Sequence, residues 1–74
     1  MILMQRYLII IEQGTSNCSA YSPDLPGCIA TGATPADVEV NMREAIAFHL
    51  EGLRADGHPV PVAQSIAAYI EVAA

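Results

Sequence analysis

The stretch YSPDLPGC at residues 21–28 decides how this chain folds. Its two prolines fix φ and restrict the residue before each of them, and Gly27 can adopt the positive φ that a tight return into a strand requires. Short strand-like runs flank this stretch at residues 18–21 and 28–32. The pattern therefore predicts a stiff connection between two antiparallel strands.

The segment before this connection supplies another strand. Residues 6–12 read RYLIIIE, an unbroken apolar run rich in β-branched side chains, which favours a central strand that is covered at least in part on both faces. Residues 13–17, QGTSN, have the composition of a turn. Together these segments predict a three-stranded antiparallel meander over residues 6–32.

The two cysteines are predicted to be small, buried thiols. If the strands pair directly across the connection, Tyr21 faces Cys28 and Cys18 faces Thr31. The thiols are then roughly 10 Å apart along the ladder, which is beyond the reach of a disulfide. Because the chain also lacks a Cys-x-x-Cys motif, we expect no metal site and no cofactor.

A helix-start signal follows the third strand at once. Thr34 is a good N-cap, Pro35 suits the first helical position, and the Asp37 carboxylate falls near the positive end of the helix. The helix is expected to run to about Asp56, with Gly57 as its C′ residue, because prolines at positions 59 and 61 forbid continuation. The side chains expected to face the sheet are Val38, Met42, Ala45, Ile46, His49 and Leu53.

The remaining residues complete a single domain. Residues 60–62 form an extended linker, and residues 65–72, SIAAYIEV, are predicted to form a final strand. The resulting fold class is α+β with the order β-β-β-α-β, and one domain covers residues 1–74.

Composition limits the functions that this chain could perform. It has 74 residues, of which 53% are apolar and 15% charged, and this is more apolar surface than one sheet and one helix can hide. We therefore expect a homodimer or a homotetramer. The net charge is −5, with three arginines and no lysine, so no basic patch is available for nucleic acid, and the acidic surface suits a basic protein partner.

The sequence also predicts a cytoplasmic protein. No stretch approaches the ~20 consecutive apolar residues of a membrane span. Residues 1–4 are apolar, but Gln5 and Arg6 interrupt the run and no basic region precedes it. We therefore expect no signal peptide.

Taken in order, these motifs resemble the HicB antitoxin family over roughly residues 6–72. The resemblance rests on PDLPGC at residues 23–28, followed by the Gly-x-Thr helix start at residues 32–34. EAI at residues 44–46 and LEGL at residues 50–53 continue the series, before the Asp-Gly helix end and the Pro-Val-Pro linker.

The resemblance implies a fold and a function. The family's domain is described as a partial, degraded RNase H-like fold. In type II toxin–antitoxin systems the antitoxin binds and blocks HicA, a small basic ribonuclease that cleaves mRNA. Many family members carry an additional C-terminal DNA-binding domain. This sequence ends at the expected last strand, so we expect no direct binding to nucleic acid.

The residues themselves predict that the chain is not an enzyme. RNase H chemistry needs several carboxylates that converge on two metal ions, and only Glu12 and Glu71 fall near strand ends. His49 lies in the middle of the apolar helix face and is expected to be a packed histidine. His58 is expected to be solvated.

Four carboxylates are the candidate partner contacts. Glu39, Glu44 and Glu51 are predicted to be exposed on the helix, where they would attract a basic toxin. Asp24 either accepts backbone hydrogen bonds within its own turn or meets an arginine of the partner.

An alternative of a different class stays open. The chain could be a solitary, non-catalytic oligomeric domain that binds a small ligand or serves as a structural adaptor. A neighbouring gene for a small basic protein would favour the antitoxin, and its absence would favour the alternative.

Overall fold

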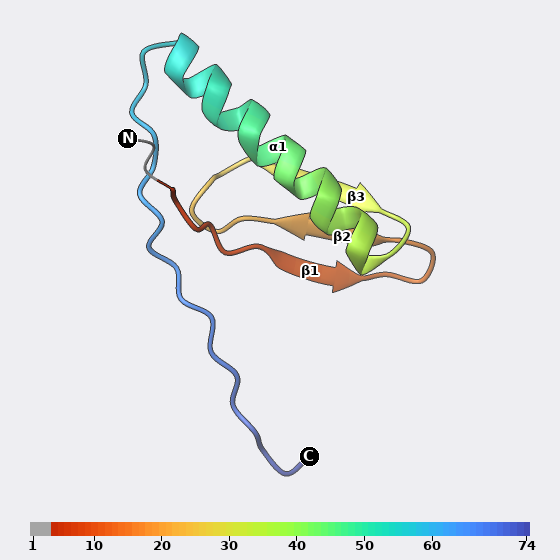
Figure 1. Cartoon of the computed structure of the whole chain (residues 1–74). Helices are drawn as coiled ribbons and strands as arrows, with labels where there is room; N and C mark the ends of the chain where they lie inside the picture. The colour runs from red at the N-terminus through yellow and green to blue at the C-terminus, as the bar shows by residue number, and fades with distance from the viewer. Residues whose placement is uncertain (1–3) are drawn as a thin grey trace.

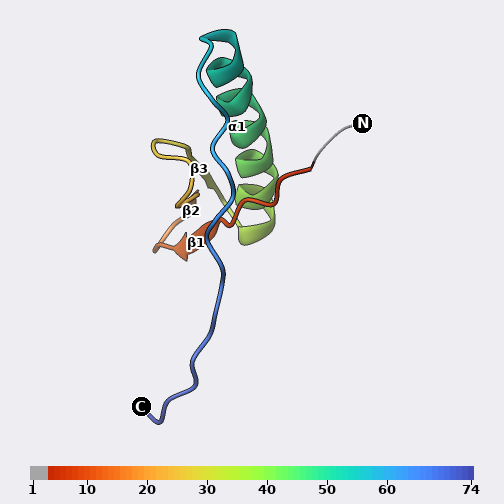
Figure 2. The same cartoon turned by 90° about the vertical axis from the view of Figure 1, so that its left-hand side faces the viewer.

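A computed structural model describes residues 4–74 and shows three strands and one helix in this part of the chain. The strands are β1 (Ile10–Gln13), β2 (Cys18–Tyr21) and β3 (Ile29–Gly32), and the helix is α1 (Pro35–Ala55). The strands form an antiparallel sheet of order β1-β2-β3. α1 lies across one face of this sheet (Figures 1 and 2). The predicted meander and α+β class are thus confirmed.

β1 is shorter than the predicted strand. It begins at Ile10 rather than at Arg6, because its neighbour β2 has only four residues and the ladder runs from the Ile10–Tyr21 pair to the Gln13–Cys18 pair. The apolar run before β1 still contributes to packing, since Tyr7 and Ile9 lie against the core.

The connection between β2 and β3 consists of two consecutive turns. Leu25 N–H donates to the carbonyl of Ser22 and Cys28 N–H donates to that of Leu25, each at 3.1 Å. Each turn has a proline in its second position, and the second turn has Gly27 at φ 81° in its third, as a type II turn requires. Leu25, where the two turns join, is fully buried.

These turns shift the register by one residue from the predicted pairing. Tyr21 faces Ile29 rather than Cys28, and Cys18 faces Gly32 rather than Thr31, because Cys28 still belongs to the second turn. Both cysteines are nevertheless free and buried, as predicted.

The core is small and lies between the sheet and α1. Its buried members come from β2, the turns and the first half of α1, and they are Cys18, Ala20, Leu25, Cys28, Val38 and Met42. Ala45, Ile46 and Leu50 pack against this cluster from later turns of the helix. α1 contacts β3 most and β1 least, so the cover over the β1 side of the sheet is thin.

α1 joins the sheet by a close approach at its start. A Cβ placed at Gly32 would lie only 2.7 Å from the backbone nitrogen of Val38, so no larger residue fits without a shift of backbone. The side-chain amide of Asn41 also donates to the carbonyl of Thr31 at 2.8 Å. These contacts fix the first turns of α1 against β3.

Both ends of α1 match the prediction. Thr34 has extended backbone angles and its hydroxyl accepts from Asp37 N–H at 3.1 Å, as an N-cap should. At the other end Gly57 adopts φ 75° and donates to the carbonyl of Arg54, while His58 N–H donates to that of Leu53. This pair of bonds is a Schellman motif, and it ends the helix.

The final strand predicted at residues 65–72 is not formed. No partner strand lies beside these residues in the described chain, which after α1 first returns past the N-terminal segment and then runs as an extended trace away from the sheet and the helix (Figure 1). The radius of gyration is accordingly 14.1 Å, against about 11 Å for a compact chain of this length.

Two other predictions concern the apolar N-terminal residues and the lack of a membrane-spanning segment. The apolar residues 1–3 lie outside the described residues. Within residues 4–74, no helix combines the length and the apolar character that crossing a membrane would need.

Candidate partner-binding surfaces

The three predicted helix carboxylates are exposed, but they do not share one face. Successive residues of a helix are 100° apart, so Glu44 and Glu51 project in nearly the same direction, opposite the core-facing side. Glu39 projects well over 100° away from them and lies instead beside Arg43, where both border a hollow next to the N-terminal segment. The structure therefore groups two of the three carboxylates.

Asp24 is bound by the chain's own C-terminal segment. One carboxylate oxygen accepts the backbone N–H groups of Gln64 and Ser65, and the other accepts the hydroxyl of Ser65, each at 2.9 Å. The expectation that Asp24 accepts bonds within its own turn is thus wrong. Proline at two of the turn positions leaves few local donors, whereas residues 64–65 bring three donors to the carboxylate.

These bonds lower the pKa of the Asp24 carboxyl. The largest cause is the backbone N–H of Ser65, followed by that of Gln64, because both donate to the ionised form. Partial desolvation acts in the opposite direction and is outweighed. Asp24 therefore stays ionised and holds the segment over the normal pH range.

Two further bonds hold the same segment to the N-terminal side of the domain. The hydroxyl of Tyr7 donates to the carbonyl of Pro61, and Ala63 N–H donates to the side-chain carbonyl of Gln5 at 3.1 Å. Residues 61–65 are thus fixed at both sides, and they set the direction in which the following residues leave the domain.

An apolar row crosses the face of the sheet that α1 leaves open. Ile10, Tyr21 and Ile29 are paired in register on the three strands, so their side chains share one face. Ile29 is 70% exposed and Tyr21 40% exposed. The next row on this face, Glu12, Ser19 and Thr31, is polar. The open face therefore offers a compact apolar contact area with a polar border.

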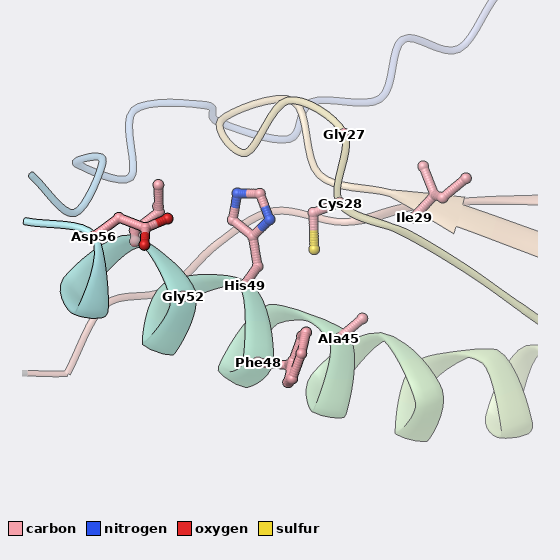
Figure 3. A pocket seen from close by; sticks show the side chains of 9 residues that line it. Gly27, Cys28, Ile29, Ala45, Phe48, His49, Gly52 and Asp56 are labelled. Carbon is pink, nitrogen blue, oxygen red and sulfur yellow. The ribbon is translucent and has the colours of Figure 1, made fainter. Parts of the chain in front are cut away.

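A hollow of about 420 Å³ lies between α1 and the second β2–β3 turn. Figure 3 shows the His49 imidazole directed from α1 toward the turn that carries Cys28, with Asp56 at the end of the helix. The side chain of Phe48, which is 79% exposed, borders the same hollow.

This hollow has the residue types of a thiol active site but not their chemistry. Cys28 is only 3% exposed, and burial raises the pKa of its thiol, so the reactive thiolate is disfavoured. Among the described residues, no hydrogen bond links Cys28 to His49, and no group of three metal-binding side chains comes together. His49 is partly buried against the sheet side, in line with its predicted position.

Two of these features were missed in the sequence. The hollow joins positions 28, 49 and 56, whose spacing carries no motif. The hydrogen bonds between Asp24 and residues 64–65, called here the Asp24 clamp, join residues that are 40 and 41 positions apart in the sequence. The only available signal in the sequence was a carboxylate in a turn that has few donors of its own.

Comparison with known proteins identifies the type of domain. The family model described as "HicB_like antitoxin of bacterial toxin-antitoxin system" matches residues 7–73. A curated relative, an uncharacterized 14.9 kDa protein in the rep-hol intergenic region of Haemophilus phage HP1, is 38% identical over 64 residues. The match covers 86% of this chain and 48% of the phage protein, so the chain spans about half the length of that relative. No solved structure matches the chain.

Proposed function

Because the chain belongs to the HicB-like antitoxin family of bacterial toxin–antitoxin systems, we propose that it neutralises a small, basic, mRNA-cleaving toxin of the HicA type. The observation that carries this proposal is the family match over residues 7–73. The net charge of −5 supplies the physical reason for a basic partner, since complementary charge speeds association and selects against acidic competitors.

The proposed contact centres on the outward carboxylates of α1. Glu44 and Glu51 lie on the same outward side of a rigid helix that is held against β3. Glu39 lies on another side of α1, where it adds to the negative electrostatic potential without sharing the face of Glu44 and Glu51. Asp24 was the fourth candidate, but both of its oxygens are engaged by residues 64–65, so its proposed role is to position that segment.

The proposed mode of action is occlusion without catalysis. The chain would cover the toxin's RNA-binding surface, and its scarcity of positive charge would leave it with no affinity of its own for RNA. The partial RNase H-like ancestry stays a prediction. In the proposed mode of action, the fold only holds the surface that binds the toxin.

The proposed assembly is a homodimer or a homotetramer. The support comes from apolar side chains that stand in solvent on the open sheet face and along residues 66–72. Monomeric proteins rarely leave large apolar patches exposed to water.

The decisive experiment identifies a neighbouring gene that encodes a small basic protein and coexpresses it with this chain. We expect that protein alone to arrest growth and this chain to restore it. If the neighbouring product is toxic and this chain neither binds it nor restores growth, the antitoxin proposal fails and the solitary ligand-binding or adaptor domain takes its place.

Charge reversal tests the contact surface. The association rate should fall well below wild type when Glu39, Glu44 and Glu51 are all changed to lysine, and by more than for any single change, because each exposed charge is worth little alone. The matched control compares two double variants: one changes Glu44 and Glu51 on the helix to lysine, and the other changes Glu12 and Glu71 outside the helix to lysine. Both double variants change the net charge equally, so a larger loss for the helix pair assigns the contact to α1. Equal losses would contradict that assignment.

A further inference from the structure

The described chain ends in an extended segment, residues 66–74, called here the C-terminal arm, whose side chains stand almost wholly in solvent. Ile66 is 90% exposed, Tyr69 96% and Ile70 82%. Glu71 is the only charged residue of the arm. An apolar, β-branched segment of this kind is stable in water only when something covers it.

The arm has the side-chain alternation of a strand. In an extended chain Ile66, Ala68, Ile70 and Val72 fall on one face, and this face is wholly apolar. The other face combines Ala67 and Tyr69 with Glu71. A strand with two largely apolar faces is typical of a position inside a sheet, where both faces are covered.

The arm is held out in one direction. The bonds from Asp24 to residues 64–65 and from Tyr7 to Pro61 fix its base, and the prolines at positions 59 and 61 favour an extended backbone. Figures 1 and 2 show the arm running away from the sheet and the helix. A segment that is anchored at its base and apolar beyond it is suited to be presented to another molecule.

The free edge of β1 is the acceptor that fits it. β2 is the one strand that pairs with β1 among residues 4–74, so the outer backbone groups of β1 are open. A hollow of about 580 Å³ lies between residues 5–9 and α1, where the helix covers the sheet least. A second hollow, of about 360 Å³, lies between residues 8–11 and residues 67–69 of the same chain.

A strand added at this edge would complete the structure there. Its backbone would satisfy the open N–H and C=O groups of β1. Its alternate side chains would enter the space on either side of the sheet edge. The apolar row of Ile10, Tyr21 and Ile29 would then gain a fourth member from the added strand.

We propose that the C-terminal arm of one chain adds as a strand to the β1 edge of a second copy, and that the second copy returns its own arm. Within one chain the arm passes its own β1 edge without pairing, and Ala67, Ala68 and Tyr69 line the far side of the 360 Å³ hollow. One molecule carries both the donor and the acceptor, so a two-fold arrangement satisfies both contacts at once.

A second copy suits the arm better than a basic toxin does. The arm has one negative charge in nine residues and thus offers little electrostatic attraction to a basic surface. Its contact would be apolar and backbone-mediated, whereas the α1 contact would depend on charge. The exchange rests on the proposed self-association, and it does not rest on toxin neutralisation.

Cross-linking between differently labelled chains tests the exchange. The photoreactive residue p-benzoylphenylalanine replaces Tyr69, which is 96% exposed, and unlabelled chains are mixed with ¹⁵N-labelled chains before irradiation. We expect peptides of mixed isotope composition that join position 69 to residues 8–13 of the other chain. Cross-links only within one chain, or to β3 or α1 of the other chain, would overturn the proposal.

The mass in solution gives an independent readout. Light scattering at micromolar concentration should give at least twice the 7.8 kDa of one chain, falling to one chain for Ile70→Lys. Ala74→Lys adds the same charge beyond the alternating segment and should keep the wild-type mass. The helical circular dichroism signal should stay unchanged in both variants, because the arm lies outside the core.

A monomeric wild type, or an Ile70→Lys variant of unchanged mass, would contradict arm exchange. Neither result bears on toxin neutralisation.

Discussion

The hydroxyl of Ser65 donates a hydrogen bond to the carboxylate of Asp24 at 2.9 Å, across 41 positions of sequence. Asp24 stands in a turn between two strands, and Ser65 stands beyond the helix that follows them. The bond therefore connects the rigid loop of the sheet to the segment that leaves the domain. It shows that the Pro-Asp-Leu-Pro-Gly sequence has a second role besides turning the chain.

The first prediction concerns the titration of Asp24. Because its pKa is lowered below the ordinary value of 3.8, the bonds to residues 64–65 are fully present above that pH and are lost as the pH falls through the lower, folded value. The amide proton shifts of Gln64 and Ser65 in NMR spectra should follow this transition. The amide of Gly14, which donates to a backbone carbonyl, should not.

Substitution checks the assignment of that titration. In Asp24→Asn the low-pH transition at Gln64 and Ser65 should disappear, while the spectrum of the sheet and helix is retained. A transition centred at or above 3.8 in the wild type would mean that the bonds do not favour the ionised carboxyl.

The second prediction compares two glycines. Gly32→Ala should reduce the free energy of unfolding by about 1–3 kcal/mol, since its Cβ would press on the backbone of Val38. Gly52→Ala should leave stability unchanged or raise it by up to ~1 kcal/mol, because it is helical and a Cβ there meets nothing within 4 Å. Urea denaturation measures both. Similar losses at the two sites would show that helix–sheet contact does not limit position 32.

The third prediction concerns Leu25, the fully buried side chain at the junction of the two turns. Leu25→Ala should cost about 2–5 kcal/mol, which for so small a domain approaches the whole stability. Val40→Ala is the control, because Val40 is 56% exposed on α1 and its change should stay within ~0.5 kcal/mol. Thermal unfolding followed by circular dichroism separates the two. A loss below ~1 kcal/mol for Leu25→Ala would show that the loop contributes little to the core.

The fourth prediction concerns Ser22, whose buried hydroxyl has no hydrogen-bond partner among the described residues. Ser22→Ala removes a polar group that gains nothing on folding, so stability should be unchanged or higher by up to ~1 kcal/mol. Thr34→Ala removes a hydroxyl that caps α1 and should cost about 1 kcal/mol. If Ser22→Ala were the more harmful of the two in equilibrium unfolding, the hydroxyl must have a partner.

Local sequence signals were sufficient where neighbouring residues determine the structure. The N-cap at Thr34, the helix end at Gly57 and the positive φ of Gly27 each follow from one side chain and its immediate neighbours. The bounds of β2 were likewise predicted to the residue, because turn-forming segments flank it on both sides.

The sequence was insufficient where distant segments meet. β1 is shorter than predicted because its partner β2 is short. The β2–β3 register differs by one residue from the predicted pairing because Cys28 belongs to a turn. The apolar character of residues 65–72 predicted a final strand, but the described chain forms none there, because a strand also needs a neighbour that the local sequence does not specify. The partners of Asp24 lie beyond the helix, and no local pattern points to them.

The Asp24 clamp marks the border between two parts of the molecule that differ in stability. Residues 10–55 share one core and should unfold only together. The arm beyond Ser65 has no part in that core, so it can move without loss of core stability. An uncovered arm would therefore offer a protease an extended substrate while the domain stays intact. The cellular lifetime of the chain would then depend on whether its arm is covered, and much less on how firmly its core is packed.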